Sequence, residues 1–384
     1  MKVAIIGAGF AGLCASVLLK KAGVSFCLYE RQARAGKKLL ATGNGRCNLT
    51  NKNLSPDYYY GDRDFASYAL SAFDNNALID FMLSIGVPCV AEENKIFPRS
   101  LQASSILDML RLAEGECEIC EKEVKKIVPS KNGFKVVTDI EESFDKVLIC
   151  CGGKASKSLS GGGSYNLLTD LGYKLTPLKP AIVQLKCDGT KALNGIKVNG
   201  AVTIDNRTEK GEILFTAYGL SGPPVLQIAR DASGKTVDLD LVPDLTFNEI
   251  LELFNQKQSL DYLTAEHLFT GFLNKQLGRE LLRACDITPF STPVSKIKPH
   301  QLKALANKVK KFSFEIKDTN GFENAQVTAG GISCEHFDKT TMESKKHKGL
   351  YLAGEILDVD GECGGYNLQW AFSSACVAVE DIIK

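Results

Sequence analysis

Residues that commonly carry acid–base or metal chemistry are scarce in this sequence. Its 384 residues include only four histidines, one tryptophan and four methionines. The histidines are His267, His300, His336 and His347, and none of them lies in a recognisable cofactor motif. Histidine is therefore not the expected proton donor of an active site.

The sequence also lacks a long apolar run and an excess of charge. No apolar stretch approaches the roughly 18–20 residues that cross a bilayer. The 46 basic and 45 acidic residues leave a net charge of +1, so composition alone indicates no polyanionic partner. Glycines interrupt the apolar start of the chain, which argues against a signal peptide. We expect a cytoplasmic protein without a membrane partner.

The cysteines do not form the pattern of a disulfide or metal framework. The thirteen cysteines are scattered and odd in number, unlike those of a small secreted domain. Cys117 and Cys120 form a C-x-x-C pair, but no second pair stands at ligand spacing, so we expect no metal site. Cys150 and Cys151 end an apolar run, where packing thiols are expected rather than a vicinal disulfide.

The chain begins with a clear nucleotide-binding pattern. Residues 2–6 form a β-branched run, residues 13–22 place apolar side chains at helical spacing, and residues 25–29 form a second strand. The turn from Gly7 to Gly12 joins the first strand to the helix. Glu30 ends the second strand, where a carboxylate accepts a hydrogen bond from an adenosine ribose.

Each glycine of this turn has a separate expected role. Gly7 permits the turn, Gly9 lets the backbone approach a pyrophosphate, and Gly12 allows close packing of helix and strand. The helix N-terminus at Phe10 and Ala11 offers N–H groups and a positive dipole end to phosphates. The turn with its flanking strands, helix and acidic residue predicts a bound dinucleotide.

The end of the chain supplies a second pattern. Residues 349–353 are expected as a buried strand, followed by Gly354-Glu355, and Gly365 opens an amphipathic helix. This resembles the second cofactor signature of flavoproteins with two dinucleotide folds. There, the N–H groups of Asn367 and Leu368 would stabilise negative charge on a reduced flavin. A dehydrogenase that uses NAD alone needs no such segment, so tightly bound FAD is expected.

Four stretches carry a more specific resemblance, namely GKKLLATGNGRCNLTN, AQVTAGGIS, TMESK and GLYLAGEILDVDG…GGYNLQWAFSSA. They are similar to the YhiN/BaiN-like, or aminoacetone-oxidase-like, family of bacterial FAD-dependent flavoproteins in the two-dinucleotide-binding-domain superfamily. The resemblance covers most of the chain and is strongest at both ends. It implies that the glycine-rich stretch from Gly36 to Asn48 lies along FAD.

The resemblance also implies which residues contact FAD. Beyond the glycine turn and Glu30, they are Arg31, Lys37, Lys38, Thr42, Asn44, Gly45, Cys47, Asn48, Val124, Gly152, Gly354, Glu355, Asp358, Gly365, Asn367 and Leu368. Val124 is expected to meet the adenine through its backbone, and Glu355 to bind the ribityl hydroxyls.

Two positions depart from the family pattern. Ala217 stands where members commonly have a histidine, and Cys151 replaces a small polar residue. A role for that histidine is therefore absent or has passed to Tyr218. The catalytic residues stay unknown, with Tyr218, Cys47 and Tyr366 as candidates. For Cys47, a redox-active thiolate is one interpretation and a small contact residue is the other.

The middle of the chain indicates an insertion. Residues 121–153 alternate like strands around an Asn132-Gly133 turn. Several short strand-like runs follow, the first of them at residues 182–186, and Thr246 to Glu249 then forms a capping box. We expect an α/β fold whose discontinuous Rossmann-like FAD-binding domain is interrupted by a β-barrel-like domain and a helical subdomain. The expected bounds are 1–179 and 321–384 for the FAD domain, 180–243 for the β domain, and 244–320 for the helical subdomain with a return strand.

We therefore expect an FAD-dependent oxidoreductase that transfers a hydride between flavin N5 and a small organic substrate. No second G-x-G-x-x-G turn with an acidic partner is present, so any NAD(P)H would bind transiently. Two alternatives stay open. One is a flavoprotein that acts on tRNA through the lysine-rich segment 296–311, and the other is a flavin-binding protein without turnover. An apolar stripe in that segment favours a solvated helix face over a nucleic-acid patch. The substrate and the choice between monomer and homodimer stay open.

Overall fold

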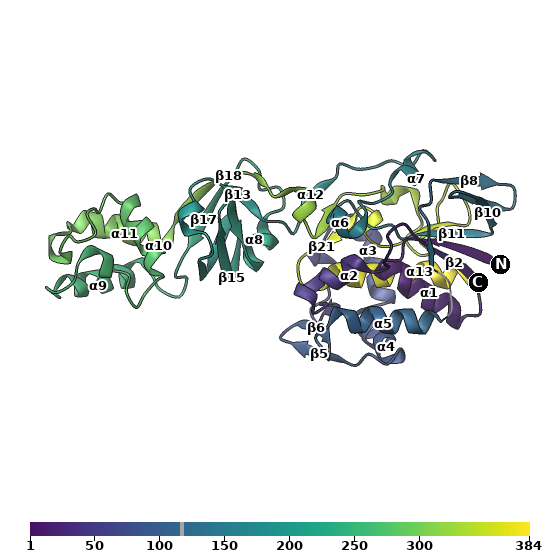
Figure 1. Cartoon of the computed structure of the whole chain (residues 1–384), viewed down its shortest axis with the longest axis horizontal. Coiled ribbons are helices and arrows are strands. Elements are labelled where there is room, and N and C mark those ends of the chain that lie inside the picture. The colour runs from purple at the N-terminus through teal and green to yellow at the C-terminus, as the bar shows by residue number, and fades with distance from the viewer. Residues whose placement is uncertain (116–118) are drawn as a thin grey trace. The chain divides into compact units, whose positions relative to one another are not determined.

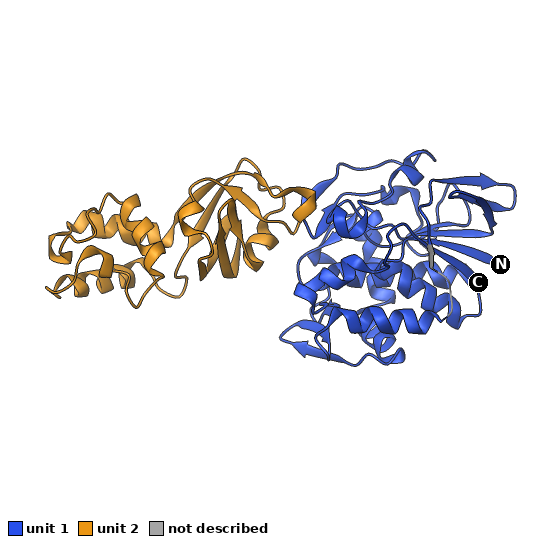
Figure 2. Cartoon of the chain, viewed as in Figure 1, with its two compact units in different colours: residues 1–180, 325–384 blue, residues 181–324 orange. Residues whose placement is uncertain are grey.

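The structure is a computed structural model that describes residues 1–115 and 119–384. The pair Cys117–Cys120 lies outside the described side chains. The chain divides into two compact units, shown in different colours in Figure 2. Unit 1 comprises Met1–Pro180 and Ala325–Lys384, and unit 2 comprises Ala181–Asn324.

Unit 1 is built on a five-stranded parallel sheet in the order β20-β11-β1-β2-β7 (Figure 1). Its strands are β1 (Lys2–Ile6), β2 (Ser25–Glu30), β7 (Ile119–Glu121), β11 (Lys146–Ile149) and β20 (Leu350–Leu352). The near-continuous apolar run of β1 fits a strand covered on both faces. Strands from both ends of the sequence thus meet in one sheet.

Three helices of unit 1 pack together beside this sheet. Helix α1 (Phe10–Lys21) contacts both α5 (Ala103–Glu114) and α13 (Tyr366–Ile382). Most side chains of α1 and α13 are buried, because both helices lie within the core of the unit. The remaining longer helices are α3 (Arg63–Ala72) and α4 (Asn75–Ser84).

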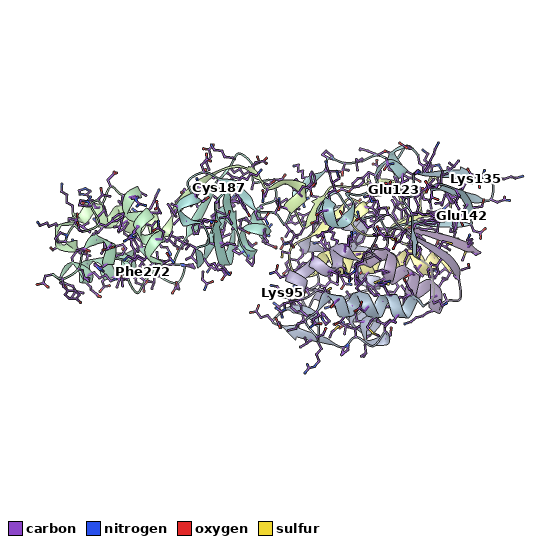
Figure 3. The ribbon with its side chains drawn as sticks, in the orientation of Figure 1. Lys95, Glu123, Lys135, Glu142, Cys187 and Phe272 are labelled. Carbon is purple, nitrogen blue, oxygen red and sulfur yellow. The ribbon has the colours of Figure 1, made fainter. Side chains whose placement is uncertain are left out.

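Unit 1 also carries small antiparallel sheets. Strands β8 (Lys126–Ser130), β9 (Gly133–Val137) and β10 (Glu141–Phe144) form a meander. Glu142, labelled in Figure 3, accepts hydrogen bonds from Lys2 and from the Tyr29 hydroxyl, and so joins the meander to the parallel sheet. The others are β3 (Thr50–Asn51) with β6 (Lys95–Pro98) and β5 (Cys89–Glu92), β4 (Tyr59–Gly61) with β21 (Val359–Gly361), and β12 (Lys179–Ala181) with β19 (Val327–Ala329).

Unit 2 contains a closed six-stranded barrel in the order β13-β16-β15-β14-β17-β18. The strands are β13 (Leu185–Cys187), β14 (Lys197–Ile204), β15 (Arg207–Thr216), β16 (Gly219–Ser221), β17 (Thr236–Asp240) and β18 (Phe312–Thr319). Cys187, labelled in Figure 3, is a buried side chain of β13. Closing the sheet leaves no free strand edge.

The helical part of unit 2 lies between β17 and β18 in sequence. It consists mainly of α9 (Phe247–Gln258), α10 (Lys275–Ala284) and α11 (Pro299–Lys310). The expected capping box is present at the start of α9, where Thr246 and Glu249 each accept from the other's backbone N–H. Phe254 of α9 forms an aromatic cluster with Phe269 and Phe272, the last of which is labelled in Figure 3.

The expected fold class is confirmed, with one local exception in the insertion. A strand was expected at 182–186, yet β13 begins only at Leu185. Ile182 has φ of +50°, a left-handed conformation that a β-branched residue rarely adopts and that interrupts a strand. Among the described residues, no helix combines the length and apolar character needed to cross a membrane.

Candidate cofactor site

The glycine turn after β1 is held by the strands on either side of it. Gly7 has φ of +106° and donates its N–H to the Tyr29 carbonyl at 2.8 Å. A Cβ atom on Gly12 would lie 1.9 Å from the Gly7 carbonyl oxygen, so only glycine fits there. A Cβ on Gly9 would meet no atom within 4 Å. Gly9 is therefore the glycine of the turn that faces open space.

Glu30 lies beside this turn at the end of β2. One carboxylate oxygen accepts from the backbone N–H of Ala8 and the other from that of Gln32, both at 2.9 Å. These bonds fix the carboxylate next to the helix N-terminus. The following residue, Arg31, pairs with Glu123 at 3.4 Å and donates to the Gly163 carbonyl at 3.3 Å.

The polar stretch that follows has an unusual backbone. After the short helix α2 (Lys37–Ala41), Gly43, Asn44, Gly45 and Cys47 all have positive φ. Left-handed conformations at non-glycine residues cost energy and cluster at functional sites. Beyond this turn, the side-chain oxygen of Asn48 is buried and has no hydrogen-bond partner among the described residues.

Lys38 links this stretch to the end of the chain. Its ammonium lies 2.6 Å from a carboxylate oxygen of Glu355, and both side chains are largely buried. The other oxygen of Glu355 accepts from the Thr328 backbone at 2.8 Å. The neighbouring Lys37 instead donates to the Gln32 amide oxygen at 3.1 Å. The two lysines therefore differ, because Lys38 alone of the two is paired with a carboxylate of the described residues.

Helix α13 anchors the second pattern. Gly354 donates its N–H to the Ser374 hydroxyl at 2.9 Å, and its carbonyl accepts from the Trp370 indole at 3.1 Å. The helix starts after Gly365, where a Cβ would lie 2.6 Å from the Thr50 backbone. The sequence patterns do not single out Ser374, Trp370 or Thr328, although all three lie in the stretches that carry the resemblance.

The side chain of Asn367 closes the loop before the helix. It accepts from the Gly361 backbone N–H at 2.8 Å and donates to the Gly361 carbonyl at 2.7 Å. Leu368 is half-buried on the first turn. The backbone of Asp358 is held at both ends: its N–H donates to the Ile332 carbonyl, and its carbonyl accepts from the Asp62 N–H. These bonds fix the backbone around the N-terminus of α13.

The three catalytic candidates have different environments. Cys47 is fully buried, and burial raises the pKa of its thiol to about 12, so it is a neutral thiol at pH 7. Tyr366 is buried, burial raises the pKa of its phenol, and its hydroxyl donates to the Asn53 carbonyl at 3.4 Å. Tyr218 is 42% exposed and belongs to unit 2. The neutral thiol weighs against a redox-active thiolate at Cys47.

The remaining cofactor candidates also belong to unit 1. Val124 is buried, and Gly152 has φ of +64°; a Cβ added to Gly152 would meet no atom within 4 Å. Cys151, which departs from the family pattern, lies next to Gly152, and burial raises the pKa of its thiol to about 12. Among the described residues, no cluster of three or more histidine, cysteine, aspartate or glutamate side chains could hold a metal ion.

These residues fit an FAD molecule. Open space lies at Gly9 and at Gly152, which stand at the ends of two neighbouring parallel strands, where dinucleotides bind in such sheets. Asn48 offers a buried oxygen without a partner. The helix N-termini of α1 and α13 offer backbone N–H groups of the kind that suit phosphate and negative charge.

Comparison with known families supports the same conclusion. The HI0933-like protein Rossmann domain matches residues 1–381. The chain belongs to this family. The match spans the unit 2 insertion as well as both parts of unit 1, so the whole architecture is that of the HI0933-like family.

Two curated relatives match nearly the whole chain. A 3-dehydro-bile acid delta(4,6)-reductase of Clostridium scindens is 37% identical, over 98% of this chain and 98% of the relative. A ribosomal RNA dihydrouridine synthase of Escherichia coli is 30% identical, over 99% of this chain and 97% of the relative. The resemblance expected from sequence is therefore confirmed.

A solved structure shares the fold at low identity. The 3-ketosteroid delta1-dehydrogenase of Sterolibacterium denitrificans, in complex with 1,4-androstadiene-3,17-dione, has a TM-score of 0.51 at 10% identity, over 99% of each chain. This likeness shows a shared fold, and the enzyme class rests on the family and its reductase relative. This member of the HI0933-like family is an FAD-dependent oxidoreductase.

Proposed function

We propose that the protein is a flavin-dependent reductase of carbon–carbon double bonds conjugated to a carbonyl group. The observation that carries the proposal is that two relatives of nearly full length are named for reactions of this one kind. A 3-oxo bile acid with double bonds at positions 4 and 6 has both bonds conjugated to its ketone. Dihydrouridine is uridine whose ring double bond, conjugated to a ring carbonyl, has been saturated.

Such a reaction adds a hydride to the carbon β to the carbonyl and a proton to the α carbon. When bound and reduced, FAD supplies the hydride. The chain's part is to bind and orient. The turn at Gly9 and the start of α1 would hold the phosphates, Glu30 the adenosine ribose, and the start of α13 the pyrimidine end of the flavin. The cofactor contacts expected from sequence, Asn44 and Gly45 among them, are part of this proposal.

The proton needs a neutral acid. Cys47 and Tyr366 are both neutral at pH 7, which is the form that donates a proton, although burial raises both pKa values and so makes each a weaker acid. Within the described residues, Glu355 is less suited, because its carboxylate is matched by Lys38 at 2.6 Å. Cys47 and Tyr366 are thus the acids to test first.

A free small molecule is the favoured substrate, and a uracil ring in RNA is the second candidate. The second rests on the name of the E. coli relative. Charge favours the small molecule over RNA, because the net charge is only +1 and two lysines of the lysine-rich segment 296–311 are already paired with aspartates. Lys310 pairs with Asp240 at 2.6 Å, and Lys311 with Asp238 at 3.1 Å.

The test uses the flavin-loaded protein, reduced anaerobically and then mixed with a candidate acceptor. A steroid 4,6-dien-3-one should restore the yellow flavin absorbance within the mixing experiment, and the saturated 3-ketone of the same skeleton should not. A parallel arm uses ribosomal RNA transcripts containing uridine or, as the control, dihydrouridine. If neither the dienone nor the uridine transcript restores the absorbance, the proposal is wrong.

The electron donor is part of the proposal. NADH or NADPH would reduce the flavin from a transient site, since no second nucleotide-binding turn is present in the sequence. Stopped-flow mixing of each nucleotide with the oxidised protein should bleach the flavin. A flavin that neither nucleotide bleaches would favour another donor.

A further inference from the structure

The side chain of Tyr165 is the feature of unit 1 that the site described so far does not use. It follows the glycine run 161–163 and caps the short helix α7 (Asn166–Thr169). Tyr165 is only 9% exposed, and its hydroxyl oxygen is buried without a hydrogen-bond partner among the described residues. A buried hydroxyl without a partner costs roughly 1–3 kcal/mol, so its persistence requires an explanation.

The surroundings of this hydroxyl are those of the cofactor site. Burial is the main cause that raises the pKa of the Tyr165 phenol, followed by the charges of Glu355 and Asp358 and a smaller effect of Cys151. The backbone N–H of Lys154 is near enough to offset part of that rise, but it is outside hydrogen-bonding geometry and, as a donor, would leave the phenol proton without an acceptor. Glu355 is the carboxylate paired with Lys38. The phenol therefore stays protonated and has a proton to donate.

The backbone around Tyr165 leaves its ring in contact with the same glycines. A Cβ on Gly163 would lie 2.9 Å from the Tyr165 ring and 3.3 Å from the Gly153 carbonyl group. A Cβ on Gly153 would in turn lie 2.4 Å from Glu355. Tyr165, Gly163, Gly153 and Glu355 thus form one continuous set of contacts at the end of β11.

The nearby carboxylates do not serve as acceptors for this proton. Glu355 already accepts from Lys38 and from the Thr328 backbone, one on each oxygen. No bond from Tyr165 to Asp358 satisfies the hydroxyl either. An acceptor that enters the site from outside the chain would satisfy the hydroxyl, and FAD offers many oxygen and nitrogen acceptors.

We propose that the Tyr165 hydroxyl donates a hydrogen bond to the bound flavin cofactor and is a positioning residue of the site. The inference rests on the cofactor site proposed above. It explains why the hydroxyl is buried and without a partner in the protein alone, and it gives Gly163 the function of admitting the ring. It extends the sequence-based set of contacts by one residue.

The experiment compares Tyr165→Phe with a matched control, Tyr173→Phe. Tyr173 is also a buried tyrosine of unit 1, but its hydroxyl already lies 2.8 Å from the His347 ring. Protein stripped of FAD is titrated with FAD by flavin fluorescence, and the melting temperature of the FAD-free form is measured by circular dichroism.

Tyr165→Phe should weaken FAD binding about tenfold, since one hydrogen bond is lost. The FAD-free form should keep or gain thermal stability, because the hydroxyl that is removed had no partner. Tyr173→Phe should show the reverse, with unchanged FAD affinity and a lower melting temperature. A merely structural role of Tyr165 would lower the melting temperature of the FAD-free form instead.

The outcomes separate this inference from the proposed function. If wild-type protein does not bind FAD, both the cofactor site and the role of Tyr165 are wrong. If wild-type protein binds FAD and Tyr165→Phe binds it within twofold of the same affinity, only the role of Tyr165 is wrong.

Discussion

Two glycines three residues apart illustrate how a single Cβ atom has different consequences in one turn. At Gly12 the added atom would lie 1.9 Å from the Gly7 carbonyl oxygen, whereas at Gly9 it would meet open space. Both positions belong to the same sequence motif. Only the structure shows that close packing requires glycine at Gly12, whereas Gly9 borders space that a ligand can enter. Gly12 is required by the fold, and Gly9 is the position that leaves room for a ligand.

This difference predicts separate phenotypes for two alanine variants. Gly12→Ala should destabilise the protein by roughly 1–3 kcal/mol, because the helix must move away from the turn. Gly9→Ala should keep wild-type stability without FAD and lose FAD affinity. Thermal melting and FAD titration of both variants provide the measurement. A Gly9→Ala protein that retains full FAD affinity would contradict the close approach expected at Gly9.

At the scale of elements, the sequence predicted best where local patterns were strong. The bounds of β1 and the capping box of α9 agree with the structure, because a glycine turn and a reciprocal side-chain bond are local signals. The strand expected at 182–186 was wrong, since the left-handed conformation of Ile182 is set by tertiary context.

The candidate site was predictable to the level of segments. Both ends of the chain were expected at FAD, and the Lys38–Glu355 pair shows that they do meet within unit 1. Tyr165 could not be identified from sequence, because it matters through a missing hydrogen bond that only packing reveals. The same holds for Ser374 and Trp370, which act on the backbone of Gly354 from the helix that follows it.

The contact between α1 and α5 contains a buried acid, Glu114, that accepts a hydrogen bond from Ser16. Ser16 has one hydroxyl proton, yet its oxygen lies 2.8 Å from the Leu13 carbonyl and 2.9 Å from a carboxylate oxygen of Glu114. The Ser16 hydroxyl donates toward both acceptors, and its bond to the carboxylate favours the ionised form of Glu114. Burial outweighs this effect and raises the pKa of Glu114.

The raised pKa of Glu114 determines how the stability of the folded protein changes with pH. Because the folded pKa of Glu114 lies above its unfolded value, its stabilising contribution is complete below about pH 4.3 and is lost as the pH rises through the folded value. Glu114→Gln is uncharged at every pH and avoids the cost of burying a carboxylate, so it should melt about 2 °C or more above wild type at pH 8. The difference should shrink toward pH 5. Asp108→Asn, on the exposed face of the same helix, is the control and should show no such trend. An unchanged difference between pH 5 and pH 8 would contradict this assignment.

At the scale of the whole molecule, every residue assigned to the cofactor belongs to one of the two units. The chain leaves unit 1 after Pro180 and returns at Ala325, so both parts of the expected FAD domain fold as one body. The single tryptophan, Trp370, is buried in α13 of unit 1. Its fluorescence therefore reports the unfolding of unit 1 without engineered probes.

A ligand that binds only the folded state of unit 1 must raise the transition that Trp370 reports. At FAD concentrations one hundred times the dissociation constant, the free energy of unfolding should rise by about 2.7 kcal/mol, which raises the melting temperature of a unit of this size by roughly 5–10 °C. Glu30→Arg should abolish the gain, because the carboxylate expected to bind the ribose is replaced by a cation beside the helix N-terminus. The measurement is tryptophan emission during heating, with and without FAD, for both proteins. If the wild-type midpoint does not move at saturating FAD, unit 1 does not bind the cofactor. If Glu30→Arg gains as much stability as wild type, the dinucleotide binds elsewhere than at the turn that begins the chain.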